Sequence, residues 1–363
     1  LSRAHTRHGW WLPVLALAGW AHTIVGTGRW PAGDGPHILG IAMRLAQMLR
    51  EGALAEFSWC FPSLLAPHPP LAYAPATLAY FVLGGGRWAH LAAGALVLFL
   101  CWDGLRRLSG SVVSAHLGLL WLAAAGVVWQ QAESYGIDLV AGAFVVQALS
   151  HLAASRQLRS HRHAALWGAW MGAAFLAKYT APMFLWAPCL IAAVWVVRRG
   201  RWAQLGAGIA GWAVVALPWY VQRGAEVLSY ATTSNTATAE LSSHTSLVAG
   251  AWWAAENLGW YPAVLIDNIG VPGVVAVALG LWLPFRAGSP RSARWIVILA
   301  VLGGWAILAN QMQRQGRYLL PALPLLVLFP AVVRGRLLLA PIAVLGAWGA
   351  LQLYAVGGNT PTS

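Results

Sequence analysis

The chain has 363 residues, of which 59% are hydrophobic and only 9% are charged, and its mean hydropathy is +0.62. A soluble domain carries about 25% charged residues, so this composition excludes an ordinary soluble protein. The net charge of +13 does not indicate nucleic-acid binding, because the basic residues form short clusters between apolar runs and not one stripe. No polar block of domain size interrupts those runs. We therefore expect residues 1–363 to form a single integral membrane domain, with no soluble domain.

Apolar runs long enough to cross about 30 Å of hydrocarbon recur along the whole chain. They predict an all-α polytopic membrane protein with about 11–12 transmembrane helices. The expected spans are 10–28, 88–105, 112–129, 137–154, 164–180, 182–197, 202–221, 261–283, 294–310, 318–333 and 337–356. A shorter apolar piece at 71–84 is ambiguous by its length.

Arginine clusters determine the expected orientation, since cytoplasmic loops are enriched in Lys and Arg. The clusters assigned to the inner side of a bacterial plasma membrane are 106–107, 156–162, 198–201, 286–294 and 334–336. Residues 29–70 and 222–260 then form long outer loops that face the periplasm or exterior. Only one crossing fits between 71 and 107, so 71–84 is either a half-helix or re-entrant piece, or Arg106-Arg107 breaks the rule.

The first outer loop contains a predicted juxtamembrane helix over 36–51. Pro36 suits its first turn, and Gly52 suits its C-terminal cap. The residues that form one apolar face are Ile38, Ile41, Leu45 and Met48. Such a face is typical of a helix that lies on the membrane, and the alternative is a helix packed on the protein. A weaker second case is 246–258.

Two segments of this outer loop carry groups suited to chemistry. Asp34 directly precedes the predicted helix, so its carboxylate can cap the helix, or it can act as a general base for an acceptor hydroxyl. The two roles are compatible. His68 stands before Pro69-Pro70-Leu71, where the chain re-enters the membrane; it can meet a phosphate or be an exposed turn residue.

Further candidates lie at later outer helix ends. Glu133 and Asp138 flank a short outer tip. Glu133 can simply be solvated and Asp138 can cap the helix that it opens; alternatively, the two carboxylates can bind a cation or orient an acceptor. No metal-ligand spacing is specific enough to assign an ion here, so no metal site is predicted. Lys178 is the only lysine; its ammonium can bind a phosphate or snorkel at a helix end. Arg314, Arg317 and Tyr318 follow on the same side, and together with Lys178 they can form a cationic site for a lipid-linked phosphate.

In this order the segments resemble the GT-C glycosyltransferases, in particular the bacterial branch that is like protein O-mannosyltransferases and aminoarabinose lipid A transferases. The resemblance covers nearly the whole chain. Its motifs are Asp34 before a juxtamembrane helix, His68-Pro69-Pro70-Leu71, Asp138, Ala177-Lys178-Tyr179-Thr180, and Arg317-Tyr318-Leu319-Leu320-Pro321. The chain has Gly35 where that family often has a second acidic residue, and it lacks the C-terminal soluble domain of some relatives. Both departures leave the acceptor open.

The resemblance implies membrane helices beneath an outer-facing cavity, a polyprenyl-phosphate sugar as donor, and Asp34 as the catalytic carboxylate. Lys178, Arg317 and His68 would bind the donor phosphate, while Glu133, Asp138, Tyr179 and Tyr318 would bind the acceptor or a cation. No cofactor is predicted, although a divalent cation stays open. The acceptor would be a lipid, polysaccharide or protein, and membrane lipids are the other expected partners.

Two other classes of protein fit an apolar chain. A transporter of a lipid or small molecule predicts ionisable residues at the bilayer midplane, and the spans here are nearly free of them. A non-catalytic scaffold explains the apolar bulk. It does not explain a lone lysine, or acidic residues that, apart from Asp103, all fall outside or at outer helix ends.

Overall fold

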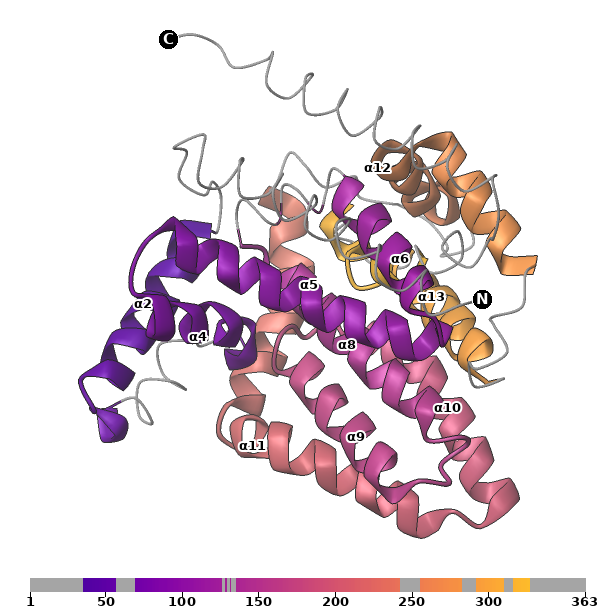
Figure 1. Cartoon of the computed structure of the whole chain (residues 1–363), viewed down its shortest axis with the longest axis horizontal. Helices are drawn as coiled ribbons and strands as arrows, with labels where there is room; N and C mark the ends of the chain where they lie inside the picture. The colour runs from indigo at the N-terminus through magenta and orange to yellow at the C-terminus, as the bar shows by residue number, and fades with distance from the viewer. Residues whose placement is uncertain are drawn as a thin grey trace, which may run out of the picture.

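The computed structural model of the chain is built from helices packed side by side (Figure 1). It describes residues 35–56, 69–125, 128, 131, 135–241, 255–282, 292–309 and 316–326, and these contain no strand. The elements are α2 Gly35–Arg50, η3 Pro70–Ala72, α4 Ala74–Leu83, α5 Arg87–Ser109, α6 Val112–Ala124, α8 Ile137–Ala154, α9 His161–Phe175, α10 Pro182–Arg199, α11 Trp202–Leu241, α12 Ala255–Trp282, α13 Ala293–Leu308, η4 Gly316–Leu319 and α14 Leu323–Leu326. The prediction of an all-α polytopic protein is confirmed.

Within the described residues, four helical stretches are long and apolar enough to cross a membrane: α5, α8, α10 and residues 202–229 of α11. α13 and α4 are shorter apolar helices. The 10 residues of α4 rise only about 15 Å, half the thickness of the hydrocarbon. Its length therefore favours the half-helix among the alternatives left open for 71–84, since α4 alone is too short for a full crossing.

The predicted helix of the first outer loop is α2, and it lies beside α4 (Figure 1). Ile38, Leu45 and Met48 are buried in the protein, so its apolar face packs on other helices and is not open to lipid. Arg50 Nε and Nη2 donate to the carbonyl oxygens of Phe81 at 2.9 Å and Tyr80 at 2.7 Å. These bonds satisfy carbonyls at the C-terminal end of α4. The packed alternative therefore describes this helix.

α8 lies at the centre of the bundle, between α5, α9, α10 and α13 (Figure 1). Nearly all of its side chains are buried, including the polar Gln147 and Ser150. α5 crosses it closely at Gly104, where an added Cβ would lie 2.5 Å from Val146 Cγ1. Small residues at such crossings let membrane helices approach, because packing and not hydrophobic exclusion drives their association.

α9 and α11 run parallel and also touch through glycines. A Cβ on Gly168 would lie 1.8 Å from Gly208 O, and one on Gly211 would lie 2.2 Å from Ala165 O. α11 continues to Leu241, so the first part of 222–260 is helical where an outer loop was expected. Polar side chains indicated a loop, yet residues 225–241 contain neither glycine nor proline to end the helix.

Asp138 and His151 mark the two ends of α8, about 20 Å apart along the helix axis. Arg107 Nη1 lies 3.2 Å from His151 Nε2, so the pair Arg106-Arg107 and the arginine-rich α8–α9 loop share one end. Lys178 contacts Asp138 at the other end. The predicted orientation puts the arginine clusters on the inner side of the membrane and Lys178 on the outer side, so it requires them to lie at opposite ends of α8.

Candidate functional site

A buried ion pair joins two of the residues singled out in the sequence. Lys178 Nζ donates to Asp138 Oδ1, and the two side chains are 7% and 1% exposed. The same ammonium lies 4.9 Å from the centre of the Tyr318 ring, a distance typical of a cation–π contact. We call Asp138, Lys178 and Tyr318 the Lys178 cluster. It brings together three segments that are far apart in the sequence.

The Lys178 side of the cluster is held by a tight turn between α9 and α10. Lys178 N donates to Ala174 O at 3.1 Å, and Ala181 N donates to Lys178 O at 3.0 Å. Pro182 then begins α10, as its fixed φ favours. Both backbone polar groups of Lys178 are therefore bonded, and the side chain leaves from a fixed point.

Asp138 lies in the first turn of α8, where the positive end of the helix dipole stabilises a carboxylate. Gly136 precedes the helix, and its N–H donates to Gln131 O at 2.7 Å. A Cβ on Gly136 would lie 1.5 Å from Gln131 Oε1, so a larger residue there would have to displace the buried Gln131 side chain. The backbone bond between Gly136 and Gln131 holds the segment just before α8, and hence the first turn in which Asp138 lies.

The third segment reaches the cluster across the face of α8. η4 ends at Leu319, and the next two residues pack on Gly142, where an added Cβ would lie 3.0 Å from Leu320 O. Gly142 is one helical turn after Asp138, so both lie on one face of α8. This packing places Tyr318 beside Lys178. The side chain of Arg317 lies outside the described part of the chain.

The proline-rich entry to the membrane also meets this region. Leu71 N donates to Leu176 O at 2.7 Å, two residues before Lys178. Tyr135 OH accepts from Ala76 N at 3.0 Å and donates to Ala72 O at 3.4 Å, so it caps the first turn of α4. Burial raises the pKa of the Tyr135 hydroxyl, which keeps it protonated.

The sequence found part of this site and missed another part. Asp138, Lys178 and Tyr318 come together, and Tyr179 lies in the same turn, partly buried. Asp34, His68 and Glu133 lie outside the described residues. Tyr135 was missed, and no sequence signal distinguishes it from other tyrosines near span ends; its φ of 49° is a feature only the backbone reveals.

Two further properties of the site bear on ligands. Thr180 Oγ1, two residues after Lys178, is buried and has no hydrogen-bond partner within the described part of the chain. Buried hydroxyls nearly always have a partner, so a ligand oxygen is a natural one. No three His, Cys, Asp or Glu side chains come together among the described residues as a metal ion would require.

No protein-family model and no curated protein sequence matches the chain. Two solved structures of ArnT from Cupriavidus metallidurans do. The structure bound to undecaprenyl phosphate is 18% identical, with a TM-score of 0.68 over 98% of this chain and 66% of that chain. The apo structure is 18% identical, with a TM-score of 0.60 over 91% of this chain and 60% of that chain. This chain thus spans less than two thirds of the length of those proteins. At this identity the likeness concerns the fold: the chain has the fold of ArnT, an aminoarabinose transferase of the GT-C class, as the sequence motifs predicted.

Proposed function

We propose that this protein is a membrane glycosyltransferase that takes a sugar from a polyprenyl-phosphate donor. The acceptor would be a lipid, a polysaccharide or a protein on the outer side of the bacterial inner membrane. The observation that carries the proposal is the fold, which follows ArnT over 98% of the chain, and that ArnT structure binds undecaprenyl phosphate. Fold alone does not determine function, so the site has to support the chemistry independently.

The described part of the site supports it through convergence. Leu71, Asp138, Lys178 and Tyr318 come from four of the motifs that suggested the GT-C resemblance, and all lie at one end of α8. A scaffold gives no reason for these segments to meet at a buried lysine. In the proposed enzyme, Asp138 and Tyr318 orient the ammonium, and a donor phosphate binds beside it, with the Thr180 hydroxyl as a further donor.

The proposed reaction is a single displacement with inversion at the anomeric carbon. Asp34 takes the proton of an acceptor hydroxyl, whose oxygen forms the new bond to the anomeric carbon as the bond from that carbon to the phosphate oxygen breaks. The electron pair of that bond leaves with polyprenyl phosphate. Lys178, Arg317 and His68 would stabilise the negative charge that develops on this phosphate.

The test uses the purified full chain in lipid nanodiscs. A panel of polyprenyl-phosphate sugars that differ only in the sugar is offered with lipid, glycan and peptide acceptors, and released polyprenyl phosphate is measured. Every sugar gives the same released lipid, so one readout serves for all donors in the panel. Wild type is expected to release it with at least one donor and acceptor. In proteoliposomes of the same protein, movement of intact donor across the bilayer would indicate a transporter, and absence of any binding to polyprenyl phosphate would support a scaffold.

A further inference from the structure

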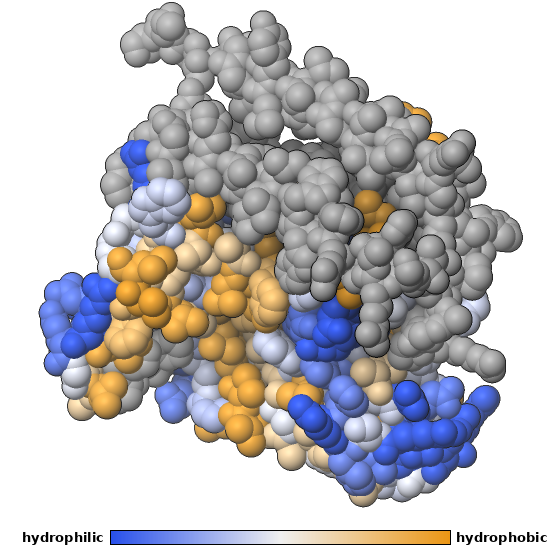
Figure 2. Space-filling view, in the orientation of Figure 1, coloured by the Kyte–Doolittle hydropathy of each residue, from blue (hydrophilic) through white to orange (hydrophobic). Residues whose placement is uncertain are grey.

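The end of α8 opposite the Lys178 cluster carries a dense group of arginines. They come from the α8–α9 loop, the first turn of α9, the last turn of α10 and the turn before α11. We call them the arginine patch: Arg156, Arg159, Arg162, Arg198, Arg199 and Arg201. All are exposed except Arg201, which is half-buried. Figure 2 shows the hydrophilic surface they belong to at its lower right, where Figure 1 draws these turns.

Contacts between the helix ends bring the patch into one place. Gln204 Nε2 lies 3.3 Å from His161 Nε2, which joins the first turns of α11 and α9. Arg201 N donates to Val196 O at 3.2 Å, so the turn after α10 folds back on that helix. The last turn of α10 and the first turn of α9 therefore border the same surface.

The loop that presents Arg156 and Arg159 is held in an uncommon conformation. Arg156, Gln157 and Leu158 have φ values of 52°, 63° and 61°, which residues other than glycine adopt only where the surroundings hold them. Ser155 Oγ accepts from Leu158 N at 3.0 Å, and the Leu158 side chain is fully buried. The loop is thus anchored at its centre, while the arginines on either side point to the surface.

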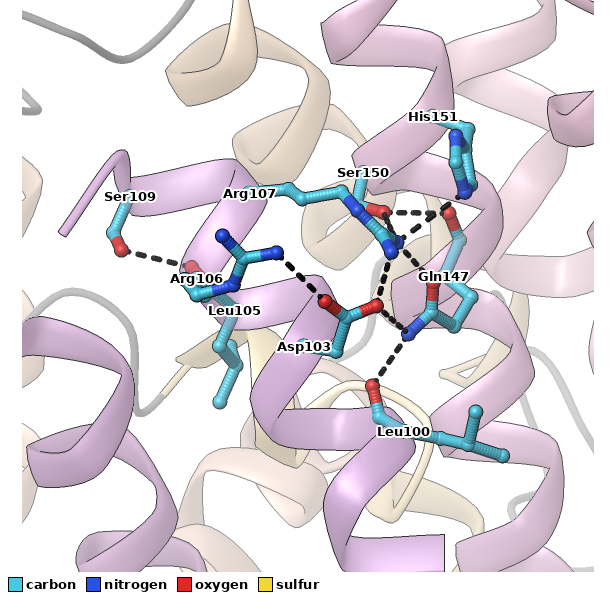
Figure 3. A network of polar contacts seen from close by, with 9 residues as sticks. All are labelled: Leu100, Asp103, Leu105, Arg106, Arg107, Ser109, Gln147, Ser150 and His151. Carbon is cyan, nitrogen blue, oxygen red and sulfur yellow. Dashed lines mark hydrogen bonds and ion pairs between the residues drawn. The ribbon is translucent and has the colours of Figure 1, made fainter. Parts of the chain in front are cut away.

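Figure 3 shows the polar network at this end of α8, in which the carboxylate of Asp103 lies between Arg106, Arg107 and Gln147. Asp103 accepts from Arg106 Nη2 at 3.0 Å and pairs with Arg107, so its charge is already matched. Arg107 Nη1 donates to Gln147 Oε1 at 2.6 Å and lies 3.2 Å from His151 Nε2. None of the ion pairs found in the described part of the chain involves an arginine of the patch.

Apolar side chains continue from the patch along α10 and α11. Val194 and Val197 are exposed on the last turns of α10, and Trp202 and Ile209 are exposed on the first turns of α11. This arrangement matches a lipid. The arginines lie where a headgroup would bind, and the exposed apolar side chains next to them lie where its acyl chains would pack. A soluble acidic protein would not cover the apolar part.

We infer that the arginine patch binds the headgroup phosphate of an anionic phospholipid. The planar fork of a guanidinium group bonds phosphate oxygens in pairs, which suits arginine better than lysine for this role. Basic pockets between membrane helices bind anionic headgroups in the same way, and Trp202 stands where an interfacial aromatic is favoured. This site is independent of the proposed sugar transfer.

The experiment measures lipid binding to the purified full chain by native mass spectrometry. Phosphatidylglycerol, cardiolipin and phosphatidylcholine are titrated, and inorganic phosphate serves as the headgroup probe without acyl chains. Arg162→Gln alone and the pair Arg159→Gln with Arg162→Gln are compared with Arg44→Gln. Arg44 is a matched control, because it is exposed on α2 and its loss changes the charge by the same amount.

Wild type is expected to bind the anionic lipids more tightly than phosphatidylcholine. Each arginine near an anionic headgroup adds about fivefold in affinity, so the single variant should bind about fivefold and the double variant about 25-fold more weakly. Arg44→Gln should stay within about twofold of wild type. The double variant Arg159→Lys with Arg162→Lys keeps the positive charge on which the orientation in the membrane depends. Its affinity for the anionic lipids should fall between those of wild type and the Arg159→Gln, Arg162→Gln pair. Equal affinity for charged and neutral lipids, an equal loss in Arg44→Gln, or inorganic phosphate binding as tightly as lipid would overturn the proposal.

Discussion

The ion pair between Lys178 and Asp138 gives the sharpest test of the site, because both groups are almost fully buried. We consider Lys178→Met, Asp138→Asn and the double variant. Removing one partner leaves an uncompensated charge in the protein interior, which costs about 3–5 kcal/mol. Removing both leaves a neutral pair of similar volume, and such replacements of buried pairs are close to neutral.

The free energies therefore should not add. The two single variants sum to about 6–10 kcal/mol of destabilisation, while the double variant should lie within about 2 kcal/mol of wild type, a coupling of at least about 4 kcal/mol. The free energy of unfolding is measured in mixed micelles of dodecyl maltoside and sodium dodecyl sulfate, followed by tryptophan fluorescence. Additive losses within about 0.5 kcal/mol would show that the two charges do not interact, and the argument from burial would fail.

The same double variant separates folding from ligand binding. It is expected to be folded and to lack the ammonium, whereas Lys178→Met alone lacks the ammonium but leaves the charge of Asp138 buried and unpaired. If Lys178 contacts the donor phosphate, the double variant should bind polyprenyl phosphate more weakly by about 1.5–3 kcal/mol, or roughly ten- to a hundredfold. Binding equal to wild type would leave Lys178 a purely structural role.

Other variants address the remaining parts of the molecule. Asp34→Asn should keep donor binding and lose transfer, since an amide does not take the acceptor proton; normal turnover in the release assay would remove Asp34 from the mechanism. Thr180→Val should weaken donor binding by about 1 kcal/mol without loss of stability, because the hydroxyl lacks a partner within the described residues, and a destabilised protein would point to a structural bond instead. Gly168→Leu should separate α9 from α11 and lower the free energy of unfolding by more than about 3 kcal/mol; the reasoning on close packing is wrong if stability is unchanged. In a background without native cysteines, intact cells should label Leu54→Cys and not Ala203→Cys with an impermeant thiol reagent, and the reverse pattern would invert the orientation.

Local signals made several elements predictable from the sequence. Pro36 and Gly52 mark the ends of α2, and Gly52 has the positive φ of 71° expected of a C-terminal cap. The sequence left two alternatives for 71–84, a half-helix or re-entrant piece or a break of the positive-inside rule, and the length of α4 favours the first. The extension of α11 was not predicted, because polarity indicates exposure to water, whereas helix continuation depends on the absence of breakers.

The site shows where such inference stops. Asp138 and Lys178 were each singled out, but for different ligands, as a cation or acceptor site and as a phosphate site. The structure joins them in one ion pair across 40 positions of sequence. A single sequence carries no record of that contact, because it arises from the packing of α8 against the α9–α10 turn. Tyr135 belongs to the same class, since its bond to Ala76 exists only in the folded bundle.

The ribosome completes α8 before it makes α9, α10 and α13, three of the helices that pack around it. Until the α9–α10 turn emerges, the carboxylate of Asp138 enters the membrane without Lys178. A carboxylate at the centre of a helix during insertion costs about 2.5–3.5 kcal/mol, and one near a helix end costs less. The 40 positions that separate the two residues therefore set a delay between insertion of α8 and neutralisation of its charge. α8 reaches its most stable position only after α9 and α10 have folded back on it, so these three helices are expected to leave the insertion machinery as one group.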